Sequence, residues 1–363
     1  MPTDPRDLRI LPLEKAETLP SAWYTDPGFH ELDRRVIFER TWQIVGHVAQ
    51  VRNIGDRMVS EVAGNPIVVV RGKDGGLRAF YNVCRHRGGP LATEDGCESM
   101  LQCRYHGWTY TLDGELRGVP RWDRVDLFDR KDFGLVPVHV DTWEGFVFVN
   151  LDPASPAVPL SDVVAGITER IAPETLPSKR FHSRSVYDVA CNWKVYVDNY
   201  LEGYHVPLVH PGLFGMLDYR EYATETFVWY SLQQSPLRPE ASIFGTGHAY
   251  YYFIYPNLTL NILPGRLQTN RVIPVSRDRC RVLFEYYYDD IESDEGRRRI
   301  EEDKRSAHET QLEDIMICEH VQRGLASNAY DRGRFSVELE GGVWHFQNLI
   351  RGAIADNAQS PHE

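Results

Sequence analysis

The sequence predicts an α+β protein with two domains, a small all-β domain followed by a larger domain that mixes helices and strands. Between residues 43 and 152, short β-type runs alternate with Gly-containing turns. A segment with three prolines, 152–159, then has the composition of a linker. After it, strand patterns occur together with a long helical pattern, and 363 residues are enough for two sizeable cores.

The first part of the chain is predicted to be helical. Residues 1–42 are expected to form a segment that packs on the second domain. Asp26 followed by Pro27 is typical of an N-cap and the first helical residue, and apolar residues continue the pattern toward Trp42. The β domain, 43–152, is then predicted to contain strands at 67–70, 79–83, 101–105 and 146–150.

The second domain is assigned to residues 160–363. Its predicted helices cover 193–205 and 294–325. Its predicted strands lie at 250–255, 259–263, 267–274 and 279–288.

Composition and charge exclude several classes of protein. A net charge of −12 argues against a nucleic-acid partner, which normally requires a basic surface. No run of 18 apolar residues is present, so no membrane span is expected. The charged start, residues 1–7, lacks the apolar core of a signal peptide, and a cytoplasmic location is expected. In that compartment, the six cysteines are expected to bind metal or lie in cores rather than form disulfides.

Two cysteines and two histidines form the first metal-binding pattern. Cys84 and His86 are followed, after sixteen residues, by Cys103 and His106. Because each half supplies one Cys and one His, the pattern suits two irons, one held by both cysteines and the other by both histidines. It therefore predicts a Rieske-type [2Fe–2S] cluster; structural zinc is the alternative. Cys97 lies outside the pattern and is expected to be a structural thiol, and the remaining cysteines are expected to lie in cores: Cys191, Cys280 and Cys318.

The second metal-binding pattern lies in the segment 192–211. On the predicted helix, Glu202 and His205 are three residues apart and share a face. Pro207 is expected to end that helix, so that His210 can turn back toward the same metal. Two histidines five residues apart are often unrelated, but an upstream one-electron donor needs an acceptor. His205 and His210 are therefore predicted to bind a mononuclear Fe(II) that keeps open positions for O₂ and substrate.

The third iron ligand must be a carboxylate from elsewhere, and the helix 294–325 offers Glu313 and Asp314. At 100° per residue, Asp314 falls within the apolar stripe formed by Ala307, Ile317, Cys318, Val321 and Leu325. Glu313 falls on the polar face. A carboxylate on a buried face is costly unless it is paired or bound to metal, so Asp314 is predicted to be the ligand. A buried ion pair with Arg or Lys is the alternative.

With these motifs, the chain resembles the terminal-oxygenase α subunits of Rieske non-haem iron oxygenases over almost its whole length. The resemblance includes residues 42–47, both cluster loops, 192–194 and the Glu-x-x-His-x₄-His run. Residues 255–258 and 313–325 look most like the choline, glycine-betaine, carnitine and stachydrine oxygenases. The chain differs from the choline-type pattern at Gln347, where a second His is expected.

The resemblance implies a Rieske domain, a helix-grip catalytic domain with an antiparallel sheet, and a head-to-tail homotrimer. It also implies that Glu202 bridges the iron ligand His205 and His106 of the adjacent subunit. Glu at this position, where many ring-hydroxylating relatives have Asp, favours the quaternary-amine branch. Asn199 is expected to act beside the iron ligands without binding metal.

A small quaternary or tertiary methylated amine is the predicted substrate, to be hydroxylated or oxidatively N-demethylated. Tyr204 and Trp229 are the main candidates to face its cation, and Tyr200, Tyr251 and Tyr252 are further aromatic residues near the iron. Aromatic side chains here also suit ordinary strands. Hydroxylation or demethylation of an aromatic acid is the alternative, and it would need a cationic anchor such as Arg220, Arg238 or Arg266. A third reading is an electron carrier without catalysis, which the complete set of iron ligands disfavours. Because no dinucleotide fingerprint is present, electrons are expected from an NAD(P)H-dependent reductase with flavin and an iron–sulfur centre.

Overall fold

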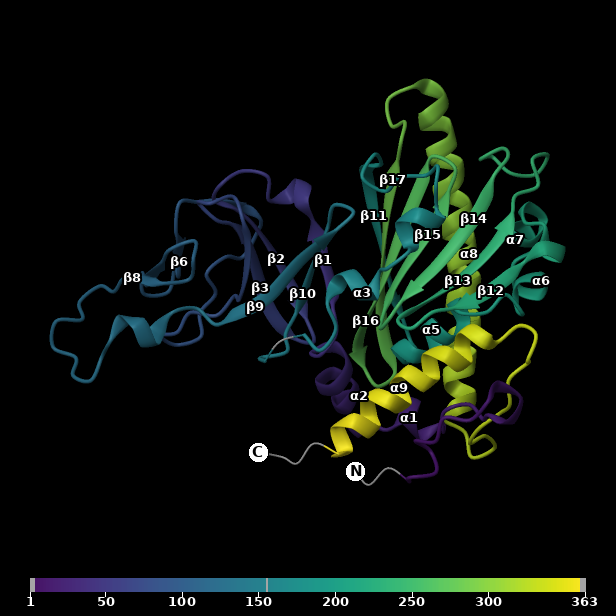
Figure 1. Cartoon of the computed structure of the whole chain (residues 1–363), viewed down its shortest axis with the longest axis horizontal. Helices are drawn as coiled ribbons and strands as arrows, with labels where there is room; N and C mark the ends of the chain where they lie inside the picture. Colours follow the sequence, from purple (N-terminus) through teal and green to yellow (C-terminus); the bar gives the residue numbers. More distant parts are fainter. Residues whose placement is uncertain (1–3, 155, 360–363) are drawn as a thin grey trace. The chain divides into compact units, whose positions relative to one another are not determined.

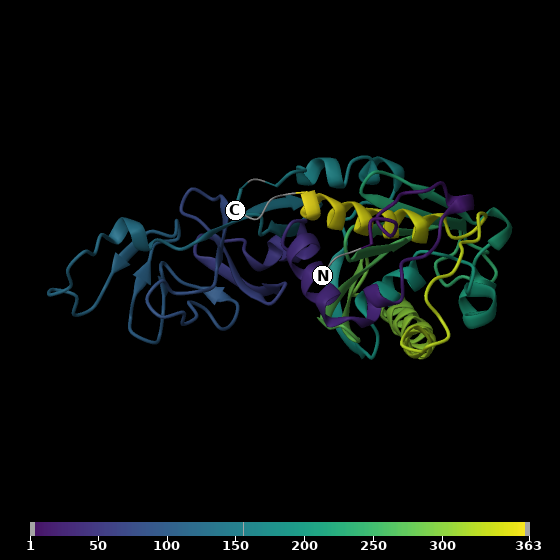
Figure 2. The same cartoon turned by 90° about the horizontal axis from the view of Figure 1, so that it is seen from below.

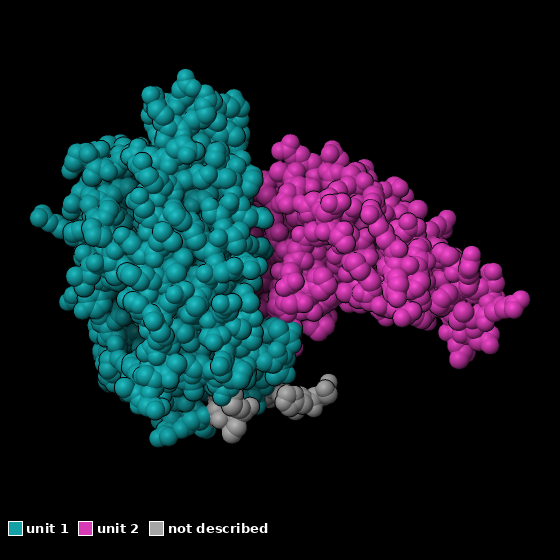
Figure 3. Space-filling model, turned by 180° about the vertical axis from the view of Figure 1, so that it is seen from behind, with its two compact units in different colours: residues 1–37, 163–363 teal, residues 38–162 magenta. Residues whose placement is uncertain are grey.

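The computed structural model describes residues 4–154 and 156–359, and the chain divides into two compact units. One unit comprises residues 38–162, and the other comprises 1–37 together with 163–363 (Figure 3). Both are built on antiparallel sheets, and long helices occur in the second, so the predicted α+β class is confirmed.

The unit 38–162 contains a seven-stranded sheet with the order β1-β10-β9-β4-β3-β2-β5 and a three-stranded sheet β6-β7-β8 (Figure 1). The strand predicted at 101–105 is shorter than expected, because residues 103–107 turn and close a Gly107 N to Cys103 O hydrogen bond of 2.9 Å. The strands are β1 (Gln43–His47), β2 (Asp56–Val62), β3 (Asn65–Arg71), β4 (Leu77–Tyr81), β5 (Gly96–Cys97), β6 (Leu101–Gln102), β7 (Thr109–Tyr110), β8 (Leu116–Gly118), β9 (Pro137–Trp143) and β10 (Phe146–Asn150), and the short helices are η3 (Val48–Gln50) and η4 (Arg130–Phe133).

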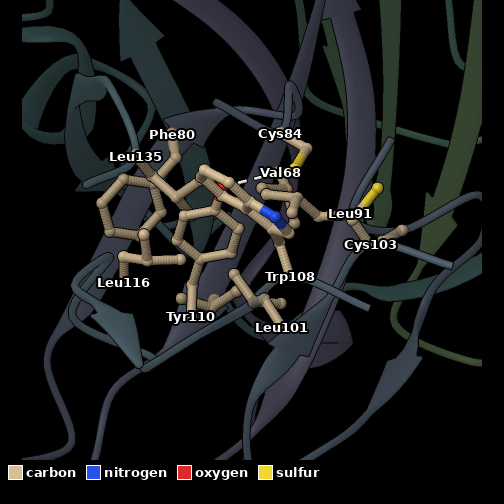
Figure 4. Close-up of a cluster of buried hydrophobic side chains, with 12 residues drawn as sticks. Val68, Phe80, Cys84, Leu91, Leu101, Cys103, Trp108, Tyr110, Leu116 and Leu135 are labelled. Atoms are coloured by element: carbon tan, nitrogen blue, oxygen red, sulfur yellow. Dashed lines mark hydrogen bonds between the residues drawn. The ribbon is translucent and has the colours of Figure 1, made fainter. Parts of the chain in front are cut away.

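Two buried clusters fill this unit. One lies between the strands of the large sheet and includes Val45, Met58 and Val147. The other joins the two sheets, and both Cys84 and Cys103 belong to it (Figure 4). The two cysteines of the predicted cluster are therefore anchored in the core, and Figure 4 shows their sulfurs at its edge.

The other unit is a seven-stranded antiparallel sheet with helices against it, in the order β11-β17-β16-β15-β14-β13-β12. Figure 1 shows the long helix α8 running along this sheet, and Figure 2 looks nearly down its axis. The strands are β11 (Arg180–Val189), β12 (Ala223–Thr226), β13 (Tyr230–Pro236), β14 (His248–Ile254), β15 (Leu258–Leu263), β16 (Arg266–Ser276) and β17 (Arg279–Tyr288).

The helices of the chain show where the sequence prediction succeeded and where it failed. α8 has the predicted bounds, and Ser293 caps it by accepting a hydrogen bond from Gly296 N at 2.9 Å. The helix predicted at 193–205 ends at Tyr200. Besides η3 and η4, the helices are η1 (Leu13–Lys15), α1 (Ala22–Thr25), α2 (Pro27–Asp33), η2 (Arg34–Phe38), α3 (Leu160–Val163), α4 (Ile167–Arg170), α5 (Trp193–Tyr200), α6 (Val206–Val209), α7 (Pro211–Met216), η5 (Tyr219–Glu221), α8 (Asp294–Leu325) and α9 (Gly341–Gln359).

The N-terminal segment is tied to α5 by buried hydrogen bonds. Asp26 caps α2 as predicted, but regular helix ends before Trp42. Trp193 Nε1 donates to Asp33 Oδ2 at 2.8 Å, and Lys194 forms a buried ion pair with the same carboxylate. Tyr24 Oη donates to Asp198 Oδ2 at 2.6 Å. These contacts fix the helix that leads to the second metal-binding pattern.

Candidate metal centres and substrate cavity

The two loops that carry the first pattern have the same hydrogen-bonded turn. Gly88 N donates to Cys84 O at 3.0 Å, and Gly107 N donates to Cys103 O at 2.9 Å. Both glycines have positive φ, +73° and +76°, a conformation that other residues adopt only with strain. Each turn therefore places a Cys at its start and a His within it.

Between the loops, the thiols lie inside and the imidazoles lie toward the surface. Cys84 and Cys103 are each 3% exposed, whereas His106 is exposed. The ring centroids of His86 and His106 are 4.7 Å apart, and the His86 ring stacks on Trp108. His86 Nδ1 is buried and has no hydrogen-bond partner in the described part of the chain. A buried nitrogen in that condition suits a metal bond.

The four side chains do not surround a single point. Around one tetrahedral zinc, with bonds of about 2.0–2.3 Å, all ligand atoms would lie within about 4 Å of one another. Among residues 4–154 and 156–359, the one group of three or more such ligand atoms within 4.8 Å is formed by other residues. Sulfurs on one side and imidazoles on the other instead suit two irons, which disfavours the zinc alternative.

The compact group is His205, His210 and Asp314, the three predicted iron ligands. Asp314 Oδ1 lies 3.0 Å from His210 Nε2 and 3.8 Å from His205 Nε2. Asn199 Nδ2 donates to the same Oδ1 at 2.6 Å. Two imidazole Nε2 atoms and one carboxylate oxygen thus converge on one point, as a facial two-His-one-carboxylate iron site requires.

The opposite ring nitrogens are both held by carboxylates. His205 Nδ1 lies 2.7 Å from Glu202 Oε1, and His205 N donates to Glu202 Oε2 at 3.0 Å. His210 Nδ1 lies 2.7 Å from Glu313 Oε2. Burial opposes protonation of His210, but the hydrogen bonds of its ring with Asp314 and Glu313 raise its pKa overall. A carboxylate at Nδ1 fixes the tautomer that presents Nε2 to the metal.

Three details of the sequence prediction were wrong here. Glu202 and His205 do not share a helix: α5 ends at Tyr200, and Glu202 meets His205 by closing a turn over its backbone N–H. Pro207 does not end a helix but occupies the first turn of α6, where its missing N–H costs nothing. Glu313 is not a free polar-face residue, because His210 lies over the edge of α8 and contacts both neighbouring carboxylates.

The buried stripe of α8 is also more polar than predicted. Val321 is 44% exposed, whereas the buried residues of the helix include four with polar side chains or thiols: Asp303, Gln311, Cys318 and Gln322. The apolar pattern used for the prediction included Cys318 but could not find Asp303, Gln311 and Gln322, although these recur with it at helical spacing. Asp314 still lies toward this buried side, with a side chain 16% exposed against 39% for Glu313.

A cavity of about 370 Å³ opens beside the predicted iron ligands. A row of paired residues across four strands contributes to its wall, namely Gln233, Tyr251, Asn261 and Gln268. Facing residues of α8 include Asp303, Ala307, Gln311 and Asp314. The aromatic part of the wall consists of Tyr196, Tyr200, Tyr222, Phe244, Tyr251 and Phe284.

The two aromatic residues predicted to face the substrate do not line this cavity. Tyr204 is 55% exposed, because the loop after α5 turns its side chain outward. Trp229 precedes β13 and packs near Tyr255 instead. Tyr200 and Tyr251, which the sequence also offered as aromatic residues near the iron, do line the cavity. Tyr222 lines it as well and was not predicted.

Of the three arginines considered as anchors for an acid, Arg266 alone is part of the cavity wall. It is 4% exposed, and its Nε donates to Asp303 Oδ2 at 3.0 Å. Tyr288 Oη donates to the same oxygen at 2.6 Å. The positive charge of Arg266 is therefore balanced inside the protein.

Comparison with known proteins decides the family. The model of the ring hydroxylating alpha subunit (catalytic domain) matches residues 178–356, and that of the Rieske [2Fe-2S] domain matches 41–129. Choline monooxygenase from Arabidopsis thaliana is 36% identical, over 94% of this chain and 83% of the relative. The carnitine monooxygenase oxygenase subunit of Escherichia coli K12 is 32% identical, over 94% and 95%.

The chain belongs to the Rieske non-haem iron oxygenases. The quaternary ammonium Rieske monooxygenase CntA superposes with a TM-score of 0.86 at 30% identity, over 95% of this chain and 99% of that one. Naphthalene 1,2-dioxygenase shares the fold, with a TM-score of 0.74 at 18% identity. This oxygenase is an oxidoreductase that carries a Rieske [2Fe–2S] cluster and a mononuclear iron, as the sequence predicted.

As a member of this family, the oxygenase works with a reductase, O₂ and a substrate. No helix within the described ranges is both long and apolar enough to cross a membrane. Gln347, the departure from the choline-type pattern, donates to Tyr24 Oη at 3.1 Å and to both oxygens of Asp198 at 3.2 Å. Burial raises the pKa of Asp198 to about 7 despite these bonds. Gln347 thus stabilises α5 through hydrogen bonds to Asp198.

Proposed function

We propose that this oxygenase oxidises a methyl group, or a carbon near it, on a small quaternary or tertiary methylated amine. The observation that carries the proposal is that the charge of the buried Arg266 is neutralised by Asp303. An aromatic acid would need a cation inside the cavity, but Arg266, the buried arginine of its wall, is paired with Asp303, and the other lining arginine, Arg305, is exposed. Ring faces of Tyr200, Tyr222 and Tyr251 suit a methylated cation instead. Choline and carnitine are the substrates named for the relatives.

Oxygen uptake and product analysis test the proposal. Purified oxygenase, its iron restored, would be mixed with a surrogate reductase and NADH. Methylated amines and aromatic carboxylates would be compared at equal concentration. We expect substrate-dependent O₂ uptake and a hydroxylated or demethylated product with amines only. Product from an aromatic carboxylate, without product from any amine, would establish the alternative.

Within this function, the residues at the iron have separate tasks. His205, His210 and Asp314 would hold the iron, which supplies O₂ activation when electrons arrive from the cluster. Glu202 and Glu313 keep the protons on the two Nδ1 atoms, so that each Nε2 presents its lone pair. Asn199 holds the Asp314 carboxylate in place. Cys84 and Cys103 would bind one iron of the cluster, and His86 and His106 the other.

We also propose that the two centres work together across subunits of a head-to-tail homotrimer, with Glu202 as the bridge. Its side chain is 13% exposed, so one edge remains open to a partner. Exposed apolar side chains lie on the elements that carry the predicted iron ligands, including Leu208 of α6 at 86% and Met316 of α8 at 56% exposed. The solved structure of CntA is described as giving insight into inter-subunit electron transfer.

The surface that would dock there is the cluster end of the unit 38–162. His106 is exposed, Tyr105 is 58% exposed, and three exposed arginines, Arg85, Arg87 and Arg104, flank the ligands. Their charge complements Glu202 and Glu313. Light scattering of the purified protein should give three times the mass of the 41.8 kDa chain. An NAD(P)H-dependent reductase with flavin and an iron–sulfur centre is the proposed electron donor, and the cytoplasmic location stays a prediction.

A further inference from the structure

A cluster of buried thiols lies where three elements of the catalytic unit meet. Cys191 directly precedes the N-cap of α5, Cys280 is on β17 and Cys318 is on α8. Cys191 is 0% exposed, and the other two are each 1% exposed, so the prediction that they lie in cores is confirmed. The sequence did not predict that they meet. The metal-ligand group found in residues 4–154 and 156–359 does not include these thiols, so a metal site does not explain the cluster.

Cys191 is the shared partner of the other two thiols. Its Sγ lies 3.9 Å from Cys280 Sγ. Hydrogen bonds from Cys280 and Cys318 lower the pKa of Cys191 to about 5, although burial opposes the shift. The same contacts raise the pKa of both donors. Because the thiolate is the nucleophilic form of cysteine, Cys191 is suited to react first and its neighbours to react second.

Cys191 and Cys280 are already close to the geometry of a disulfide. The sulfurs must approach from 3.9 Å to about 2.05 Å, a change of about 2 Å. Cys280 pairs with Val189 in the register of β11 and β17, and Cys191 follows that strand by two residues. Neighbouring segments therefore carry both sulfurs, and a change of side-chain rotamers can close the gap. Disulfides of proteins in reducing compartments are usually transient and respond to oxidants.

The cluster also lies close to the predicted iron site. Cys318 follows the predicted ligand Asp314 by four residues of α8, about one helical turn or 6 Å. Tyr196 lines the cavity beside the same ligand. Burial raises the pKa of Tyr196, and the neighbouring Asp314 and Cys318 raise it further. Tyr196 thus lies between the cavity and the thiols, and a small oxidant formed in the cavity has only one layer of side chains to pass.

We propose that Cys191 and Cys280 form a reversible disulfide with hydrogen peroxide that arises beside them when O₂ is reduced without oxidation of a substrate. O₂ that takes up two electrons and two protons gives H₂O₂. The Cys191 thiolate attacks one oxygen, the O–O bond breaks and hydroxide leaves, which gives a sulfenic acid. The Cys280 thiol then attacks that sulfur, and the S–S bond forms as the oxygen leaves in water.

In balance, the two thiols lose two electrons and two hydrogens, and one H₂O₂ becomes two molecules of water. The cluster would therefore remove an oxidant before it reaches the side chains that hold the iron. A thiol reductant restores both cysteines by exchange. The inference goes beyond the proposed function, since it does not depend on which substrate is oxidised.

Mapping of the thiols after turnover tests the proposal. Iron-loaded oxygenase would receive reductase, NADH and O₂ but no methylated amine, with catalase present to destroy peroxide in the solution. The protein would then be denatured, alkylated and digested. We expect peptides joined through Cys191 and Cys280, lighter by two hydrogen atoms than the two thiol peptides together. Dithiothreitol before alkylation should abolish the link. The exposed Cys97 should remain a free thiol, because catalase protects the surface.

Variants separate the source of the peroxide from the reactivity of the thiols. Asp314→Ala, or wild type from which a chelator has removed the mononuclear iron, should form no link during turnover. Both should form it when H₂O₂ is added without catalase. Cys191→Ser should leave Cys280 and Cys318 as free thiols. Cys318→Ser is the matched control, because Cys318 is equally buried in the same cluster, and this variant should retain the link.

Two results would overturn the inference. If Cys191 and Cys280 are recovered as free thiols both after turnover and after addition of H₂O₂, the pair is not a site of oxidation. If the link forms during turnover to the same extent without mononuclear iron, the peroxide does not arise at the iron. Neither result affects the proposed function, which O₂ uptake with methylated amines tests separately.

Discussion

The two metal centres are built in opposite ways. The predicted cluster ligands come from two short loops with the same turn, and their positions follow from local hydrogen bonds around Cys84 and Cys103. The predicted iron ligands come from a turn after α5 and from α8, so that Asp314 lies more than one hundred residues after His210. The first centre depends on the backbone of its own loops. The second depends on long-range packing and on carboxylates that form hydrogen bonds with the imidazoles. Substitution of a ligand at the first centre should therefore remove the cluster completely, whereas substitutions at the second centre should weaken iron binding to different degrees.

Loss of a cluster ligand should have the largest effect. Cys84→Ser should remove the visible absorption and the rhombic electron paramagnetic resonance signal, because thiolates are required to hold the iron. Cys97→Ser is the matched control. Cys97 lies on β5, is exposed and is outside the pattern, so its replacement should leave both signals intact. Equal bleaching of the two variants would show that the ligand assignment is wrong.

Graded loss is expected at the iron. Asp314→Ala should remove the mononuclear iron and all product while the cluster colour remains. Glu313→Gln should retain iron but bind it about 10- to 100-fold more weakly, because an amide can hold His210 Nδ1–H but no longer raises the basicity of the ring. Metal analysis after dialysis against a chelator measures both. If Glu313→Gln retains iron as well as wild type does, the hydrogen bond between Glu313 and His210 does not contribute to iron binding.

Electron transfer between the two centres should be lost in a variant that retains both the cluster and the iron. Glu202→Gln keeps size but removes charge, so cluster absorption should be normal and iron content nearly normal. The reduced cluster should nevertheless fail to re-oxidise when substrate and O₂ are added. Stopped-flow mixing of pre-reduced protein follows this directly. If Glu202→Gln re-oxidised at the wild-type rate with the wild-type product yield, Glu202 would not couple the two centres.

How far the sequence could predict each centre follows from the same difference. The two cluster loops could be recognised from spacing alone, because each loop is local. That Asp314 lies on the cavity side of α8 could be predicted because a helical wheel holds over the 32 residues of the helix. The role of Glu313 could not, since it depends on where the turn after α5 brings His210. The positions of Tyr204 and Trp229 outside the cavity could not be predicted for the same reason. Whether a side chain reaches the cavity depends on turns whose direction the sequence pattern does not encode.

The smallest expected effect concerns the tuning of the cluster rather than its assembly. Tyr110 Oη lies 3.3 Å from Cys84 Sγ (Figure 4). The same oxygen accepts a hydrogen bond from Arg85 N at 3.0 Å. Because its oxygen is occupied by that donor, its own hydrogen is available to the sulfur. A hydrogen bond to a ligating sulfur stabilises the more negative, reduced cluster. Tyr110→Phe should therefore lower the reduction potential. A bond worth about 0.5–1.5 kcal/mol corresponds to about 20–65 mV for one electron.

Protein-film voltammetry or a redox titration followed by the cluster absorption would measure this shift. Leu116→Val is a suitable control, since Leu116 lies in the same buried cluster but offers no hydrogen bond from its side chain. It should change stability and not potential. An unchanged potential in Tyr110→Phe would mean that the hydroxyl does not donate to Cys84. A lowered potential should also speed electron transfer from the reduced cluster to the iron, so single-turnover re-oxidation would rise while the iron content of the oxygenase stays constant. The local centre would then be tunable by one hydrogen bond, without any change in the long-range packing that builds the other.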